Sequence, residues 1–384
     1  MATFNLENIK IAGISCAVPN QRVETTSFYS KFGQKYVDDF INMAGVKSTY
    51  RTPEEQTSSD LCYVATRTLM EKKSISTEEI GACVFISQTP DYRVPATACV
   101  LHKRLGLSKN CMVFDVNLGC SGWVYGLNIV GSLFKTSNIE KALLLFGDTP
   151  VKHKSPEDKS TMMLFGEAGS ATLIVREDGF SVHGELMTDG DGFKAIIIPS
   201  GAYRNRNGSH ERTLWNVDGI VRSDFDSYMD GTEVFSFTIS QVPKLINSFM
   251  EARGKTIEDY DALVLHQANL YILKQIARKT KFPMEKVPVS LDRYGNTSGT
   301  SIPITLCDAY GTPTSINATS TANLTPPKLE SCRGQSAKSS INLLMSGFGI
   351  GLSWGVVEAT LDRNDILPVI YTDEYYTEGA VSHD

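Results

Sequence analysis

The sequence lacks the features that would direct a chain to a membrane, a nucleic acid or a secretory route. No apolar run approaches the roughly eighteen residues that a membrane-spanning helix needs. The formal net charge is −6, and neither sign is gathered in a long run, so we expect no nucleic acid and no membrane as a partner. The first residues have no basic segment followed by an apolar one, so we expect a cytoplasmic protein.

Cysteine spacing also argues against a metal site. The 8 cysteines are scattered without a C-x-x-C pair, and no histidine lies at ligand spacing from them. Zinc sites and disulfide frameworks both require closer or more regular spacing. We therefore expect reduced thiols, no metal and no bound cofactor.

Alternating apolar and amphipathic segments predict an α/β fold. The 384 residues exceed the usual size of one hydrophobic core, so two domains or a duplicated architecture is expected. Short apolar runs predict strands that are buried on both faces, and longer segments between them predict helices. The strands are expected at 80–87, 113–116 and 141–146, and the helices at 27–44, 60–73, 96–105 and 234–252. Residues 45–51 are predicted to form a polar connector.

Two parts of the chain resemble each other at a nearly constant offset. Residues 77–87 can be laid on 257–267, an offset of 180, and Gly119 to Gly122 on Gly295 to Ser298, an offset of 176. Such an offset indicates two related halves, 1–180 and 181–384, packed face to face. Chance similarity between amphipathic segments is the alternative.

Three polar stretches are expected to lie at the surface. Residues 190–225 are predicted to form a solvated loop, with an anion-binding loop as the less favoured alternative. Residues 311–340 are predicted to be a long surface insertion, and 362–384 an arm on a partner subunit or a frayed end.

Cys120 is the best candidate nucleophile. It follows a predicted strand and turn and precedes an apolar helix, so it lies at or just before a helix N-terminus. Unpaired backbone N–H groups and the helix dipole stabilise a thiolate there and can hold an oxyanion. A small core cysteine is the alternative, because seven other cysteines occur in the chain.

His266 and Asn296 are candidate partners of this cysteine. His266 ends a predicted buried strand, at the edge where α/β folds gather functional side chains. Asn296 lies in a turn that opens a helix. A buried structural histidine and a structural turn asparagine are the alternatives. The glycine-rich run 346–355 does not have the spacing of a phosphate-binding loop.

Four ordered motifs resemble β-ketoacyl-[acyl carrier protein] synthase III, of the thiolase-like condensing enzymes. They contain Cys120 in 114–122, His266 and Asn269 in 265–270, Asn296 in 294–298, and Gly349 and Ile350 in 348–355. The resemblance covers about residues 8–358. It implies a thiolase-like five-layered α-β-α-β-α fold made from two related halves.

The resemblance also implies an activity and the residues that perform it. Cys120 would take an acyl group from an acyl-CoA. His266 and Asn296 would donate hydrogen bonds to the thioester carbonyl of malonyl-ACP or malonyl-CoA, whose decarboxylation gives the attacking enolate. The backbone N–H groups of Cys120 and Ile350 would hold the oxyanion. Fatty-acid biosynthesis, an acyl carrier protein and a homodimer are implied as pathway, partner and assembly.

Other matching positions are implied in substrate binding, and some depart from the family pattern. Asn269 and Gly349 match binding positions, and Lys159 stands in for a basic contact to the coenzyme A phosphate. Val94 occupies the place where a partner subunit inserts a phenylalanine, so a roomier acyl site is expected. Ile350 replaces a glycine, so its φ must be negative and its side chain must crowd the site. Tyr271 replaces an arginine that helps to dock the carrier protein.

Three other activities remain as alternatives. Acyl transfer to a hydroxyl or amine would need Cys120 and a base but not Asn296. A hydroxymethylglutaryl-coenzyme A synthase would need a catalytic glutamate, and Glu167 is expected to be structural instead. A non-catalytic acyl-binding scaffold subunit would not need the Cys, His and Asn set.

Overall fold

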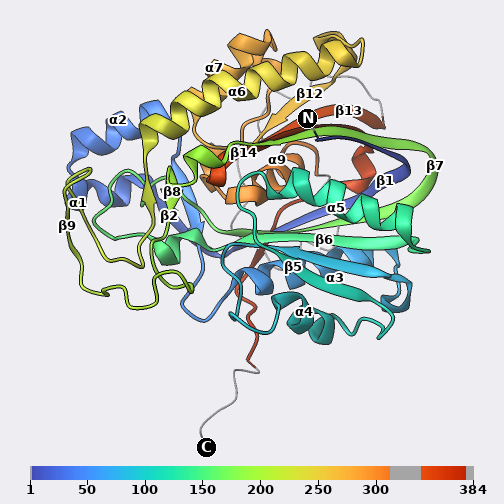
Figure 1. Cartoon of the computed structure of the whole chain (residues 1–384), viewed down its shortest axis with the longest axis horizontal. Coiled ribbons are helices and arrows are strands. Elements are labelled where there is room, and N and C mark those ends of the chain that lie inside the picture. Colours follow the sequence, from blue (N-terminus) through green and yellow to red (C-terminus); the bar gives the residue numbers. More distant parts are fainter. Residues whose placement is uncertain (1, 312–338, 378–384) are drawn as a thin grey trace, which may run out of the picture.

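The computed structural model describes residues 2–311 and 339–377. Figure 1 shows five layers, in which helices cover both outer faces of two stacked layers of strands and further helices lie between them. Three buried apolar clusters fill the spaces between these layers. The predicted α/β class is confirmed.

The strands of one layer pair in the order β5-β4-β6-β7-β1. β4, β5 and β6 pair in parallel, whereas β6 and β1 each pair antiparallel with β7. Residues of β4 and β6 are buried almost throughout, as their runs of apolar residues predict. β5 is the edge strand and is half-buried. The bounds are β1 Ala2–Pro19, β4 Ala82–Ile86, β5 Met112–Val116, β6 Lys141–Asp148 and β7 Ala168–Thr188.

The strands of the other layer pair in the order β12-β13-β14-β7. β12 Ala262–Leu265 is parallel to β13 Ser340–Gly349, which is antiparallel to β14 Ser353–Asp362. β14 then pairs with the last part of β7. Parallel pairs followed by two antiparallel pairs therefore occur in both layers, with two parallel pairs in the first layer and one in the second. The predicted division at residue 180 falls inside β7 and stays a prediction.

Helices lie in three layers around these strands (Figure 1). α3 and α4 cover the first layer of strands, α6 and α7 cover the second, and α5 and α9 lie between the two. A capping box of Thr57 and Asp60 fixes the start of α3, because each side chain accepts a backbone N–H that the helix leaves unpaired. The bounds are α3 Ser58–Lys73, α4 Thr97–Leu105, α5 Gly122–Thr136, α6 Gly231–Ala252, α7 Leu270–Thr280, α8 Leu291–Tyr294 and α9 Ser301–Tyr310.

Two predictions near the N-terminus are wrong in detail. The helix predicted over 27–44 is broken into α1 Tyr29–Phe32 and α2 Gln34–Ala44, because Gly33 adopts a φ of 83°. The polar connector predicted over 45–51 contains β3 Ser48–Arg51, which pairs with β2 Gln21–Glu24. Ser48 and Thr49 of this strand are buried rather than solvated, and Arg51 is half-buried.

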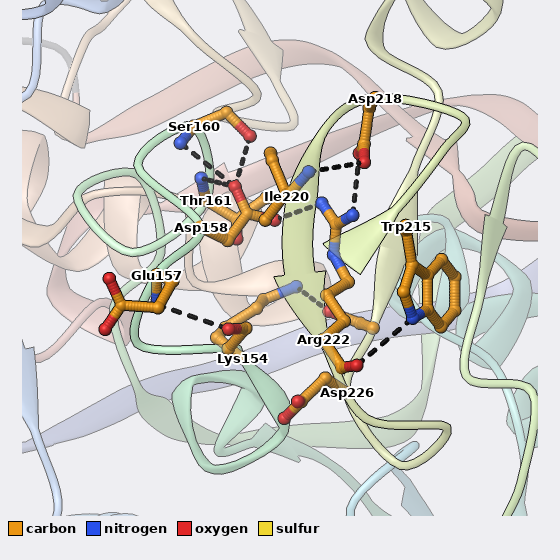
Figure 2. Close-up of polar contacts among 12 residues, drawn as sticks. Lys154, Glu157, Asp158, Ser160, Thr161, Trp215, Asp218, Ile220, Arg222 and Asp226 are labelled. Carbon is orange, nitrogen blue, oxygen red and sulfur yellow. Dashed lines mark hydrogen bonds and ion pairs between the residues drawn. The ribbon is translucent and has the colours of Figure 1, made fainter. Parts of the chain in front are cut away.

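The segment predicted as a solvated loop over 190–225 is only partly solvated. It contains β8 Ile196–Ile197, β9 Thr213–Trp215 and β10 Ile220–Arg222, and β8 pairs with β11 Tyr228–Met229. Arg222 is 1% exposed and lies between the carboxylates of Asp158 and Asp218 (Figure 2). This ion-pair cluster attaches the segment to the rest of the chain.

The described part of the C-terminal segment lies on its own chain. β15 Ile370–Thr372 pairs in parallel with β1, and the Tyr371 ring packs 5.4 Å from the Tyr50 ring. For these residues the prediction of a partner-bound arm or a frayed end is wrong, because aromatic packing and strand pairing both hold them. The surface insertion predicted over 311–340 lies outside the described residues, except at 311, 339 and 340.

Candidate active site

Cys120 lies in the turn between β5 and α5, just before the helix begins. Ser121 is the N-cap residue of α5, so Cys120 lies just before the helix, as the sequence predicts. Cys120 is 6% exposed, and Gly349 at the end of β13 packs directly against it. The backbone of the second half of the chain therefore forms one wall around a thiol from the first half.

Burial, together with the nearby charge of Asp148, raises the pKa of the Cys120 thiol to about 11. The backbone N–H of Ile350, the side chain of Ser298 and the charge of Lys154 act in the opposite direction. The sequence correctly predicts that Cys120 lies at the helix start. The prediction that its thiolate is stabilised is wrong for the protein without substrate, because the pKa of the thiol is raised. The donors around the sulfur are in place to stabilise charge when it develops during a reaction.

His266 follows β12 and is 2% exposed. Burial lowers the pKa of its imidazole to about 4, so the ring is neutral at physiological pH. Nδ1 lies 2.7 Å from the Ser301 hydroxyl, and the ring packs edge-on against Phe348. When the Ser301 hydroxyl donates to Nδ1, Nε2 carries the proton and is a donor.

Asn296 lies in the turn before α9, and its side chain is held in one orientation. Oδ1 accepts a hydrogen bond from the backbone N–H of Ser298 at 3.0 Å. Its own backbone N–H donates to the carbonyl of Leu164 at 2.8 Å. Because the amide oxygen is occupied, the NH₂ group is the part of the side chain that can serve a ligand.

Ile350 begins the tight turn between β13 and β14. Its φ is negative, as the sequence predicts, and the positive φ values in this turn fall on its neighbours Gly349 (155°), Gly351 (73°) and Leu352 (44°). Its backbone N–H lowers the pKa of the Cys120 thiol, so it lies close enough to that sulfur to donate to charge that develops beside it. A Cβ atom on Gly119 would lie 3.0 Å from Cδ1 of Ile350, so the Ile350 side chain packs beside the turn that carries Cys120.

These side chains line one cavity of about 1290 Å³. Cys120, His266, Asn296 and Ile350 all contribute to its wall, so the structure brings together the predicted reacting residues of both halves. The remaining wall is largely apolar, with contributions from α2, the segment around β8, α6 and α7. A cavity of this size is large enough to enclose a substrate far bigger than a short acyl group.

The other predicted binding residues have different surroundings. Gly349 and Asn269 line the cavity, and Oδ1 of Asn269 also caps α7 by accepting the N–H of Ile272. Lys159 lies at the surface, with its ammonium 4.6 Å from the ring of Tyr36 on the cavity wall. Val94 is 80% exposed and does not line the cavity of its own chain. Its role across a subunit contact stays a prediction.

Several residues of the site are missed by the sequence reasoning. The Ser298 hydroxyl donates to Oδ2 of Asp148 at 2.6 Å, and Ser301 holds His266. Ser298 belongs to the motif 294–298 that contains Asn296, and Ser301 follows that motif by three residues, so the sequence around Asn296 could have indicated both serines. Lys154 and Ser227 also line the cavity, but no pattern in the sequence around either residue indicates a functional role.

Glu167 is structural, as predicted. Its Oε2 accepts hydrogen bonds from the backbone N–H and the hydroxyl of Thr52 at 2.6 and 2.8 Å, and its Oε1 accepts the N–H of Val151. Within residues 2–311 and 339–377, no group of histidine, cysteine and carboxylate side chains could hold a metal ion. No helix in the same part of the chain is long and apolar enough to cross a membrane.

Comparison with known proteins identifies the family. The family model for 3-oxoacyl-[acyl-carrier-protein (ACP)] synthase III matches residues 114–190, and the model for its C-terminal part matches 250–325. A β-ketoacyl-[acyl-carrier-protein] synthase III of Clostridium perfringens is 30% identical over 352 residues, covering 91% of this chain and 98% of the relative. The chain belongs to the 3-oxoacyl-[acyl-carrier-protein] synthase III family. The resemblance inferred from the sequence motifs is thereby confirmed.

Solved structures of this family have the same fold. A 3-oxoacyl-(acyl-carrier protein) synthase from Burkholderia xenovorans LB400 is 33% identical, with a TM-score of 0.84 over 97% of this chain and 99% of that one. A synthase III from Thermus thermophilus is 26% identical, with a TM-score of 0.74 over 92% and 99%. The predicted thiolase-like fold is therefore confirmed.

Proposed function

We propose that this chain is an acyltransferase that condenses an acyl thioester with a malonyl thioester through an acyl-Cys120 intermediate. The observation that carries this proposal is the meeting of Cys120, neutral His266 and the oriented amide of Asn296 in one cavity. Family membership supports the same activity. No contact in the described site favours acyl transfer without decarboxylation or a non-catalytic scaffold.

In the first half-reaction the Cys120 sulfur attacks the carbonyl carbon of the acyl thioester. The new C–S bond forms as the bond to the leaving thiol breaks, and the thiol proton passes to that leaving sulfur. Charge that develops on the carbonyl oxygen would be held by the backbone N–H groups of Cys120 and Ile350. The start of α5 stabilises negative charge on the sulfur in the same step.

In the second half-reaction the malonyl thioester loses its carboxylate as carbon dioxide. The electron pair of the broken C–C bond moves into an enolate, whose oxygen accepts hydrogen bonds from Nε2–H of His266 and the NH₂ group of Asn296. Both groups suit this task because each donates without giving up a full proton. The apolar wall favours loss of a charged carboxylate as a neutral gas.

The enolate carbon then attacks the acyl carbon held on Cys120. A C–C bond forms, the C–S bond breaks, and the Cys120 thiolate takes a proton to return to its starting state. The 3-oxoacyl product keeps the thioester carrier of the malonyl group. His266 and Asn296 therefore act in the second half-reaction, whereas Cys120 acts in both.

The substrates and surroundings proposed for this chain follow from its relatives and its cavity. Acyl-CoA would donate the acyl group, and malonyl-ACP or malonyl-CoA would extend it, with no bound cofactor. Tyr36 and Lys159 at the cavity rim would contact the coenzyme A end of a donor. An acyl carrier protein as partner, a homodimer and a cytoplasmic location belong to the same proposal.

Intact-mass spectrometry tests the proposal directly. The protein is incubated with a panel of acyl-CoA donors from two to eight carbons, and an increase of one acyl mass on Cys120 is expected. Cys120→Ala should show no adduct. With malonyl-ACP or malonyl-CoA added, the adduct should disappear as 3-oxoacyl product forms. Absence of an adduct with every donor would overturn the proposal.

A further inference from the structure

Lys154 is a buried cation in the wall of the reaction cavity. Its side chain is 8% exposed, and the residue lines the same cavity as Cys120 and Asn296. A charged group in a largely apolar wall costs free energy unless it meets an opposite charge or several hydrogen-bond acceptors. The contacts of Lys154 therefore decide what it is suited to bind.

Within the described residues, the ammonium of Lys154 has one hydrogen-bond acceptor. Nζ donates to the hydroxyl oxygen of Ser227 at 2.8 Å and lies 4.0 Å from the centre of the Phe165 ring. An ammonium has three N–H donors, so the Ser227 contact leaves donor capacity for a ligand. The backbone N–H of Ser227 donates to the carbonyl of His153 at 2.7 Å, which fixes the two side chains beside each other.

The carboxylate that most favours the charged form of Lys154, Asp158, is already paired. Asp158 pairs with Arg222 at 2.6 Å and also accepts the backbone N–H groups of Ser160 and Thr161. Figure 2 shows Arg222 reaching both Asp158 and Asp218. Asp158 thus stabilises the Lys154 cation only at a distance, and burial lowers the pKa of Lys154 to about 8.

Lys154 lies at the reacting end of the cavity rather than at its rim. Phe165, which the ammonium faces, forms a backbone bridge with Asn296. The charge of Lys154 also acts on the Cys120 thiol, whose pKa it lowers. Lys154 is therefore placed to contact a group that the acyl chain on Cys120 carries.

We propose that Lys154 and Ser227 bind a carboxylate carried by the acyl group, so that a dicarboxylic acyl thioester is the preferred acyl donor. This inference rests on the proposed condensing activity. The Lys154 ammonium pairs with the carboxylate, and the Ser227 hydroxyl donates to its second oxygen. The apolar wall around them holds the methylene groups between the carboxylate and the thioester.

The malonyl carboxylate is a less suitable ligand for Lys154 and Ser227 than a carboxylate of the acyl group. That carboxylate loses its charge as carbon dioxide forms, so a cation bound to it stabilises the starting state more than the transition state and slows the reaction. An acyl carboxylate persists through both half-reactions, so the ion pair lowers the energy of every state equally. The chemistry therefore favours Lys154 as a specificity-determining residue for the acyl group.

Matched donor pairs test this assignment. Succinyl-, glutaryl- and adipyl-CoA are each compared with butyryl-, valeryl- and hexanoyl-CoA, which have the same number of carbons, by the rate of acyl-Cys120 formation in intact-mass spectra. The wild type should favour the carboxylated member of at least one pair by tenfold or more. Lys154→Met should remove or invert that preference, Lys154→Arg should keep part of it, and Ser227→Ala should weaken it.

Lys152→Met is the matched control. Lys152 lines the same cavity, but its ammonium already donates to the carbonyl oxygens of Glu54 and Gln56 at 2.8 and 2.7 Å, so the preference should persist in this variant. If the alkyl donors form adducts at rates equal to or higher than those of every carboxylated donor, the proposal of a carboxylate site is overturned. The proposed condensing activity is not affected by that result. A Lys154→Met variant that changes only the KM for the malonyl thioester would also overturn it. If Lys154→Met does not fold, the donor preference of Ser227→Ala provides the test instead.

Discussion

A Cβ atom placed on Gly349 would lie 2.6 Å from Cβ of Cys120 and 3.0 Å from its sulfur. The end of β13 thus touches the nucleophile, and the space left at this position fits a hydrogen atom alone. This contact joins a residue of the last third of the chain to the helix start in the first third.

Gly349→Ala should therefore abolish acylation of Cys120 and lower the free energy of unfolding by about 1–3 kcal/mol, because the added methyl group overpacks the site. Intact-mass acylation assays and urea denaturation measure the two effects. Gly190→Ala is the control, since a Cβ atom there meets nothing within 4 Å. Normal acylation of the Gly349→Ala protein would contradict the close packing.

Asn296→Ala should separate the two half-reactions. Formation of acyl-Cys120 should continue, whereas condensation should fall by roughly 100- to 1000-fold, because one donor to the enolate oxygen is lost. Single-turnover assays with preloaded acyl-enzyme and malonyl thioester measure the second step. An equal loss in acylation and condensation would show that Asn296 acts on Cys120 and not on the enolate.

Alkylation of Cys120 should depend steeply on pH. Because burial raises its pKa to about 11, the rate with iodoacetamide should rise by about tenfold per pH unit between pH 7 and 10, without a plateau near 8.5. Peptide mass spectrometry gives the rates, and the exposed thiol of Cys99 in the same protein is the reference. Asp148→Asn should speed alkylation of Cys120 at pH 8, since the Asp148 charge raises that pKa; slower alkylation would refute the electrostatic account.

His266 should make the fold less stable in mild acid. The folded protein holds its pKa at about 4 against the usual 6.5, so the unfolded chain binds the proton first as the pH falls. The contribution of His266 is fully present above pH 6.5 and should be lost progressively toward pH 4, by about 3 kcal/mol in all. Urea unfolding of the wild type and of His266→Asn between pH 7 and 4.5 measures the difference, which should shrink at low pH.

Arg222→Met should destabilise the protein by about 3–5 kcal/mol, because Asp158 would remain as a buried carboxylate without its partner. Adding Asp158→Asn to this variant should recover part of the loss, since the unpaired charge is then removed. A double-mutant cycle by chemical denaturation measures the coupling. Additive losses in the double variant would contradict a direct ion pair at this position.

The sequence predicts those residues of the site whose role depends on the short motif around each of them. Cys120 before a helix, His266 after an apolar strand and Asn296 in a turn each follow from local patterns, and the family resemblance joins them. The negative φ of Ile350 follows from its side chain alone. These properties depend on a few neighbouring residues, so the sequence alone predicts them.

Properties that depend on burial by distant segments could not be predicted. The raised pKa of Cys120 comes from its enclosure by residues that lie far away in the sequence, against the local effect of the helix start. The segment around Arg222 looks polar and solvated because its partner Asp158 is 64 residues away. Lys154 and Ser227 likewise meet only in the folded chain, 73 residues apart.

β7 has a consequence for how this protein can fold. Its first part pairs with β6 and its last part with β14, while β1 runs along both parts. Neither half can therefore complete its layer of strands without backbone that also belongs to the other. Unfolding should be a single cooperative event despite the length of the chain, and neither half expressed alone should form a stable domain, so the nucleophile and its partner donors form or are lost together.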